Sequence, residues 1–266
     1  MKLTFKRLIV LLTAIVIFCT ACKKSNDSPK PVSQTLSVSM ISGQIALNLA
    51  QSLSGAYGGI NLKSGINKPA FATIGNAPRR GVKNNFNPLN SQNALCSFLA
   101  DSVVSYDTAI DTIKSHTGGS FNFYFNCNNG VSTGYTAADS LTTTGTAPSY
   151  SFLFVVVQNY QIASLNAANS LLSVNGNLKS LVDLTYNNTA IKPTVVHDYY
   201  VLTGLTVDLT NNGDITSGTA TFTSTGSNNY GPWNYSGSIV FLGNHMANII
   251  INGTTYHANL LTGVIS

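Results

Sequence analysis

Apolar and polar residues alternate along much of this chain, and this period of two limits the possible fold more than any other feature of the sequence. Three phenylalanines and a cysteine at 121–127 alternate with Asn and Tyr, and similar rows occur at 178–186 and 199–209. Because neighbouring side chains of a strand point to opposite faces, these rows predict half-buried β-strands. The segment 150–162 is apolar at both sets of positions in its middle, which predicts a strand that is covered there on both faces.

The composition also favours strands. Charged residues make up only 9% of the chain, and all 9 acidic residues are Asp, whereas an average soluble protein has about 25% charged residues. The polar surface must therefore consist of Ser, Thr, Asn and Gly, which suit turns and strands. Glu, Lys and Arg, which favour the solvent side of helices, are absent or scarce.

One segment has the period of a helix instead. Within 36–57, apolar residues recur at strict four-residue spacing: Ile41, Ile45, Leu49, Leu53 and Tyr57. This stripe predicts an amphipathic helix that ends at Gly58-Gly59. The next segment, 61–93, has no sustained period and is interpreted as a loop-rich connection. The segment 94–114 fits either a helix or strands, and its β-branched residues favour strands.

Four short pairs predict tight hairpin turns, because Asn and Gly tolerate the positive φ that two-residue loops require. They are Asn175-Gly176, Asn212-Gly213, Gly243-Asn244 and Asn252-Gly253. We therefore expect an all-β fold, an antiparallel meander of roughly ten strands that forms a curved open sheet or a barrel. The single N-terminal amphipathic helix would pack on this sheet.

The N-terminus has the features of a secretory signal. A cationic start is followed by an apolar run at 8–18, which is too short to span a bilayer, and then by Thr20-Ala21 before Cys22. This arrangement resembles the lipobox of bacterial lipoproteins, with Cys19 where such boxes usually have Leu. The resemblance implies that 1–21 is removed and that Cys22 is acylated and becomes the mature N-terminus. Lys23 gives no inner-membrane retention signal, so the expected location is the outer membrane, in either leaflet.

The chain is accordingly divided into four parts. The signal peptide is 1–21, the lipidated cysteine and a flexible tether are 22–33, the helix and its connection are 34–93, and the antiparallel β domain is 94–266. Basic residues dominate 23–94 and acidic residues the remainder, so the basic part either contacts anionic lipid headgroups or offsets the acidic charge. The envelope location, and the lack of a basic stretch interleaved with aromatic residues, argue against nucleic acid as a partner.

The sequence gives no sign of catalytic residues, a metal site or a cofactor. Without Glu, a glycosidase with paired glutamates is excluded, and no nucleophile-elbow, zinc-protease or phosphate-loop motif occurs. The segment 208–219 resembles part of an EF-hand loop, but Thr210 and Thr219 stand where carboxylates belong. A hairpin turn is therefore favoured over a weak calcium site.

The last strands hold the candidate ligand-binding residues. If Asn252-Gly253 is a hairpin loop, Asn248 pairs with His257, and His245 falls opposite Leu260 on the other face. His257, Asn248 and Phe241 are predicted to share one face, either as a ligand wall or as a covered flank. Both faces are apolar here, so one is expected to be the core and the other to be covered by the helix, a second sheet or a ligand.

Cys96 and Cys127 are the thiols that remain after removal of the signal peptide. An oxidising envelope compartment favours a disulfide between them, with two buried free thiols as the alternative.

The leading functional hypothesis is a non-enzymatic, lipid-anchored envelope protein that binds a small apolar molecule, a glycan or an envelope protein. The rival hypothesis is an envelope hydrolase with dispersed Asp and His residues. A cleft that brings Asp198 or Asp208 near a histidine would favour the hydrolase.

Overall fold

The computed structural model describes residues 36–57, 59–66, 96 and 99–266. All of them belong to one compact unit, Thr35–Ser266. Cys22, the predicted lipidation site, lies outside the described residues.

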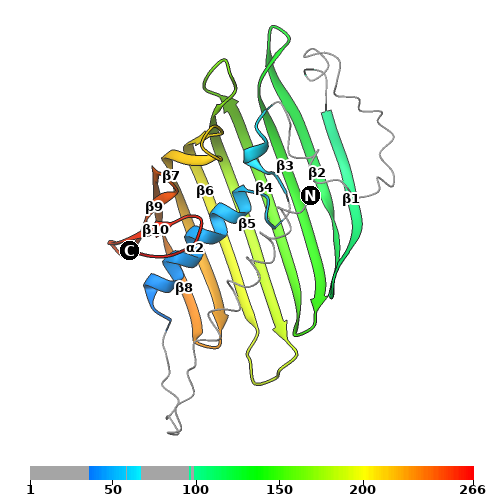
Figure 1. Cartoon of the computed structure of the whole chain (residues 1–266), viewed down its shortest axis with the longest axis vertical. Coiled ribbons are helices and arrows are strands. Elements are labelled where there is room, and N and C mark those ends of the chain that lie inside the picture. The colour runs from blue at the N-terminus through cyan, green and yellow to red at the C-terminus, as the bar shows by residue number, and fades with distance from the viewer. Residues whose placement is uncertain (1–35, 58, 67–95, 97–98) are drawn as a thin grey trace. The chain divides into compact units, whose positions relative to one another are not determined.

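Ten strands form a single sheet in chain order, and each strand pairs antiparallel with the next. They are β1 (Leu99–Ile110), β2 (Ile113–Asn128), β3 (Val131–Ala147), β4 (Tyr150–Ser164), β5 (Leu171–Tyr186), β6 (Thr194–Asp208), β7 (Asp214–Asn228), β8 (Gly231–Gly243), β9 (Met246–Ile251) and β10 (Thr254–Asn259). The sheet is open, with β1 and β10 at its two edges (Figure 1). This confirms the predicted meander and selects the open sheet over the barrel.

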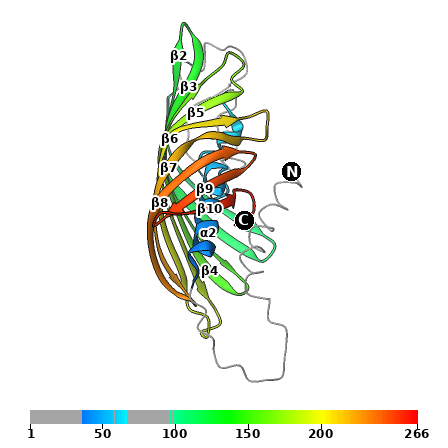
Figure 2. The same ribbon diagram turned by 90° about the vertical axis from the view of Figure 1, so that its left-hand side faces the viewer.

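The predicted helix is α2 (Val38–Leu53). It begins at Ser37, whose side chain accepts a hydrogen bond from the Met40 N–H at 3.2 Å, as an N-cap residue does. It ends at Leu53, earlier than the predicted Gly58-Gly59, because the left-handed φ of +70° at Gly55 stops the helix. A short 3₁₀ helix, η1 (Leu62–Ser64), follows. The sheet curves around α2, which lies on its concave side (Figure 2).

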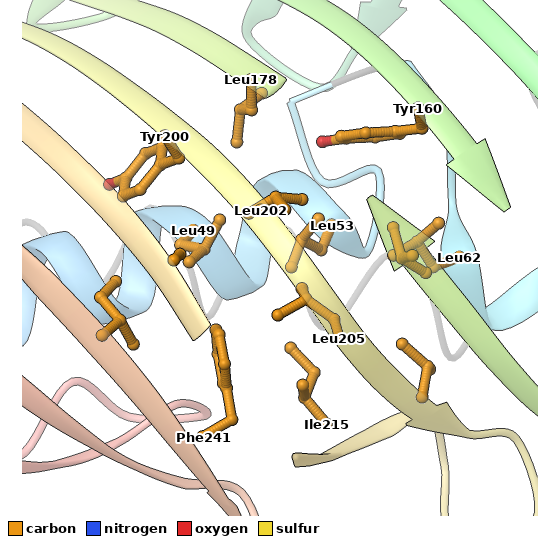
Figure 3. Close-up of a cluster of buried hydrophobic side chains, with 14 of the residues drawn as sticks. Leu49, Leu53, Leu62, Tyr160, Leu178, Tyr200, Leu202, Leu205, Ile215 and Phe241 are labelled. Atoms are coloured by element: carbon orange, nitrogen blue, oxygen red, sulfur yellow. The ribbon is translucent and has the colours of Figure 1, made fainter. Parts of the chain in front are cut away.

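The helix stripe packs on one face of the sheet, which we call the inner face. Ile41, Ile45, Leu49 and Leu53 are at most 4% exposed. Figure 3 shows Leu49 and Leu53 in one cluster with residues of the inner face, among them Tyr200, Leu202, Leu205 and Phe241. Each buried aliphatic side chain is worth roughly 1.5–3 kcal/mol, so this stripe is the main attachment of α2.

At three places on the inner face, a glycine inside a strand lies directly opposite an aromatic residue whose ring a Cβ on that glycine would contact. The pairs are Gly145 with Phe152, Gly226 with Trp233 and Gly237 with Phe222. A Cβ on Gly145 would lie 2.3 Å from Phe152 Cζ, and a Cβ on Gly226 would lie 2.3 Å from Trp233 Cζ2. The aromatic rings therefore occupy the space that a side chain would fill, and they cover the glycine backbone.

The predicted hairpins are partly right. Asn252-Gly253 forms the expected two-residue loop between the paired residues Ile251 and Thr254. Asn212-Gly213 also has positive φ and joins β6 to β7, but as the end of a five-residue loop, 209–213, between Asp208 and Asp214. Asn175-Gly176 does not form a turn, and this prediction is wrong. It lies within β5 at a bulge, where the Asn175 Oδ1 atom accepts a hydrogen bond from the Gly204 N–H of β6 at 2.7 Å.

The β8–β9 turn is displaced by one residue from its predicted place. Asn244 and His245 have φ of +53° and +57° and form the loop, while Gly243 pairs with Met246. The buried carboxylate of Asp214 accepts hydrogen bonds from the Asn244 N–H at 2.7 Å and the His245 N–H at 2.8 Å. Asp214, at the start of β7, thus fixes the position of a turn 30 residues away.

Among the helices that the structure describes, none combines the length and the apolar character needed to cross a bilayer.

Replacing Leu49 by Ala tests the attachment of α2. Leu49 is fully buried, and Leu→Ala changes at such sites lower the free energy of unfolding by about 2–5 kcal/mol. Met40→Ala is the matched control, because Met40 lies on the same helix and is 47% exposed. Urea unfolding followed by the fluorescence of Trp233, the single tryptophan, measures both. Equal losses in the two variants would contradict this account of the core.

Candidate functional site

Five aromatic side chains form a continuous, partly exposed row on the inner side of the sheet, which we call the aromatic row: Tyr57, Phe154, Phe152, Tyr150 and Tyr186. The ring centroids are 5.9 Å apart for Tyr57 and Phe154, 4.9 Å for Phe154 and Phe152, 6.2 Å for Phe152 and Tyr150, and 6.3 Å for Tyr150 and Tyr186. Phe152 and Phe154 are stacked. Contacts of this kind are favourable beyond the area they bury.

The strand pattern and the position of α2 together create the row. The even-numbered residues of β4, from Tyr150 to Ile162, point to the inner face. Val156, Tyr160 and Ile162 are buried, whereas the row residues of β4 are partly exposed. The Gln158 Nε2 donates a hydrogen bond to the Ser52 carbonyl oxygen at 3.2 Å, which places the end of α2 over Gln158. The row therefore lies where the cover of the helix stops.

The row carries hydroxyl groups but no carboxylate or ammonium group. The Tyr57 hydroxyl donates to Gln51 Oε1 and lies 3.2 Å from Asn48 Oδ1. The buried hydroxyl of Tyr150 has no hydrogen-bond partner in the described part of the chain. Burial raises the pKa of Tyr150, and the neighbouring Tyr186 adds to this shift. The row is thus a neutral surface of flat rings with one unpaired hydroxyl.

A buried polar network fixes α2 against β6. The Asn48 Nδ2 donates to Asp198 Oδ2 at 2.9 Å, and the Tyr200 hydroxyl lies 3.0 Å from the Ile45 carbonyl oxygen and 3.2 Å from Asp198 Oδ2. Burial raises the pKa of Asp198, with opposing contributions from Ser224, Asn48, Tyr200 and His197. Because such buried polar groups need their partners, this network positions the helix.

A second buried carboxylate, Asp139, lies directly opposite Gln158 on the inner face. Gln158 Oε1 accepts a hydrogen bond from the Ile60 N–H at 2.7 Å. A Cβ on Gly59 would lie 2.4 Å from that oxygen and 3.0 Å from Asp139 Oδ2, so only glycine allows this close approach. Burial raises the pKa of Asp139 to about 7, and the backbone N–H groups of Ile60 and Gln158 act in the opposite direction. Neither carboxylate oxygen has a well-aligned hydrogen-bond partner among the described residues.

His257 and Asn248 lie together as predicted, but Phe241 does not. They pair across β9 and β10 on the outer face, opposite to α2, with His257 Nδ1 2.7 Å from Asn248 Oδ1. Phe241 is 4% exposed in the core of the inner face. The prediction that Phe241 shares their face is wrong because the β8–β9 turn is displaced by one residue, which reverses the faces of β8 relative to β9.

The displaced turn also decides on which face each apolar residue of β8 and β9 lies. Ile239, Phe241, Ile249 and Ile251 are buried on the inner face. Val240, Leu242 and Ile250 lie on the outer face with Asn248. Phe241 therefore belongs to the core on which α2 packs. Of the two alternatives for this residue, a ligand wall or a covered flank, the structure shows the covered flank.

The histidines and aspartates do not form a catalytic arrangement in the described part of the chain. His197 is exposed while Asp198 is buried on the opposite face. The carboxylate–imidazole contacts are Asp107 with His116 at 2.8 Å and Asp214 with His245 at 3.3 Å. In the second contact, the Asp214 carboxylate also accepts the hydrogen bonds that hold the β8–β9 turn. No group of three His, Cys, Asp or Glu residues among those described could hold a metal ion.

The remaining predicted sites have simple structural roles. Cys96 and Cys127 form a disulfide, which links the segment before β1 to the end of β2. Asp208 lies at the β6–β7 hairpin, where its Oδ1 accepts hydrogen bonds from the Thr210 N–H at 2.9 Å and from the Thr210 hydroxyl at 2.7 Å. These bonds hold the pKa of Asp208 below its usual value. The segment 208–219 is thus the expected hairpin.

Comparison with known proteins gives no relative: no family model, no curated protein and no solved structure matches the chain.

The raised pKa of Asp139 predicts that the fold is less stable at alkaline than at acidic pH. In the unfolded chain this carboxyl has its ordinary pKa of 3.8, and in the folded chain its pKa is about 7. The stabilising contribution is therefore full below pH 4 and is lost as the pH rises through 7, by a few kcal/mol at about 1.4 kcal/mol per pKa unit. Asp139→Asn should flatten this dependence.

Urea unfolding between pH 5 and pH 8 measures the effect. Asp198 is buried as well and shifts in the same direction, so some pH dependence should persist in Asp139→Asn. An unchanged slope in that variant would contradict the assignment.

Proposed function

We propose that this chain is a lipid-anchored, non-enzymatic protein of the bacterial outer membrane and that its aromatic row binds a neutral saccharide. The anchor rests on the lipobox-like sequence at Cys22. The binding function rests on one observation, the row of partly exposed aromatic side chains beside the end of α2.

Aromatic rings in an open row suit a saccharide because they offer flat apolar surfaces to the C–H faces of sugar rings. Ligand sites typically combine such surfaces with a small number of polar groups that fix orientation. Here the Tyr186 phenol, at one end of the row, supplies a group that can bond to a sugar hydroxyl.

The absence of charge in the row favours a neutral saccharide over an acidic one. None of its five side chains is an ammonium, guanidinium or carboxylate group. Recognition of an acidic sugar generally uses charge-assisted hydrogen bonds from Arg or Lys. The expected ligand class is therefore an uncharged oligosaccharide long enough to contact several rings.

Tyr186→Ala tests the binding proposal. Titration calorimetry of the chain from Lys23 against neutral gluco-, manno- and xylo-oligosaccharides should show binding by the wild type. Loss of one aromatic contact, worth about 0.5–1.5 kcal/mol, should weaken the affinity roughly 2- to 12-fold. Tyr186→Phe, which removes only the hydroxyl, should weaken binding less than Tyr186→Ala does, with little change in stability.

Tyr124→Ala is the matched control, because Tyr124 is 43% exposed on the opposite face of the sheet. It should bind as the wild type does. A fluorescent fatty acid serves as the apolar probe. If that probe binds and no oligosaccharide does, the saccharide proposal is wrong and the row binds an apolar ligand.

Cys22→Ser tests the anchor separately. Acyl chains contribute roughly 0.8 kcal/mol per buried CH₂, so their loss should release the protein from the membrane fraction or leave it unprocessed. Cell fractionation with mass measurement of the mature N-terminus detects both outcomes. Processed Cys22→Ser protein that stays in the membrane fraction would argue against the lipid anchor.

A further inference from the structure

The outer face of the sheet carries an apolar patch at its middle. It consists of Leu153, Val155 and Val157 of β4, Leu181 of β5, and Val195 and Tyr199 of β6, which we call the outer patch. All six side chains are partly exposed. No element of the described part of the chain lies on this convex side of the sheet, as Figure 2 shows.

The surroundings of the outer patch have a different composition. The outer-facing residues of β7 include Thr219, Thr221, Thr223 and Thr225, and those of β3 include Thr142 and Thr144. The outer patch is a contiguous apolar area beside these polar strands, separate from Val240, Leu242 and Ile250 on the far side of β7, and such an area is typical of an interface. The two-sided apolarity of β4 also predicts cover on both faces, and α2 covers only the inner one.

Two opposite charges flank Leu181 on the outer face. Lys179 and Asp183 lie on the same face of β5, two residues before and two residues after Leu181. A twofold axis that crosses the strands at Leu181 would place each Lys179 opposite the Asp183 of a second copy, twice per dimer. An axis parallel to the strands would place like charges opposite each other.

From this pattern we infer that two copies of the chain pack back to back through the outer patch, with a twofold axis across β5 at Leu181. The interface is isologous, because the same patch serves both partners. Two sheets that pack face to face lie about 10 Å apart, a distance that the side chains of the outer patch can fill.

The strand register gives the expected contacts. Val155 of β4 and His197 of β6 lie at the level of Leu181, so each would face its own symmetry mate. Leu153 would face Val157 of the second copy, and Val195 would face Tyr199. Lys179 already extends over the Tyr199 ring, with its Nζ 5.6 Å from the centroid, which holds the ammonium group above the outer patch.

Charge reversal provides the sharpest test. Sedimentation velocity of the chain from Lys23 over a wide concentration range should show a dimer that dissociates on dilution. Lys179→Asp and Asp183→Lys should each raise the dimer dissociation constant roughly tenfold, since each replaces two attractive pairs by repulsive ones. The double variant Lys179→Asp/Asp183→Lys should restore it to within about threefold.

Leu181→Asp should give a monomer, and its urea unfolding shows whether the fold is intact. Leu242→Asp is the control, since Leu242 is 50% exposed on the outer face outside the patch; it should remain dimeric. A wild-type monomer at every concentration overturns the inference, as does a dimer that tolerates both single reversals or one that the double variant fails to restore.

Discussion

The contact between the stripe of α2 and the inner face is the interaction on which the rest of the structure depends. An open sheet with one apolar face cannot be stable in water unless a second layer covers that face. Here the layer is one helix of 16 residues, and it covers only part of a sheet of ten strands. The aromatic row is the part of the inner face that α2 leaves partly exposed. The position of α2 therefore determines both the buried core and the candidate site.

The sequence predicts the architecture well because its two periods are clear. The period of two in the strands and the four-residue spacing at 41–53 each indicate one kind of element, and the meander follows from short turns. The errors come from turn chemistry that a single sequence leaves ambiguous. An Asn-Gly pair suits a two-residue loop and a bulge alike, and Asn175-Gly176 forms the bulge. The β8–β9 loop is placed by Asp214, a residue that local patterns do not connect to it.

The candidate site is less predictable than the fold. Tyr150, Phe152 and Phe154 are visibly on one face of a strand, but whether a face is buried or accessible depends on where α2 crosses it. Tyr57 and Tyr186 join the row only through tertiary structure. Asp139 and Gln158 did leave a signal, since each is a polar residue at an apolar position of its strand, with Ala137 and Leu141 or Val156 and Tyr160 on either side.

The three glycine–aromatic pairs have a consequence for how this sheet selects its strand pairing. Long strands rich in Thr and Ser can pair in registers shifted by two residues without exchanging faces. Such a shift would move Phe222 from Gly237 onto Tyr235 or Ile239, where the ring would meet a bulky side chain. In each pair, the aromatic ring therefore fits against the opposite strand only in the native register. Repulsion between like charges on neighbouring strands can disfavour wrong registers, but this chain has few charges. Here the steric fit between an aromatic ring and a glycine backbone disfavours them instead.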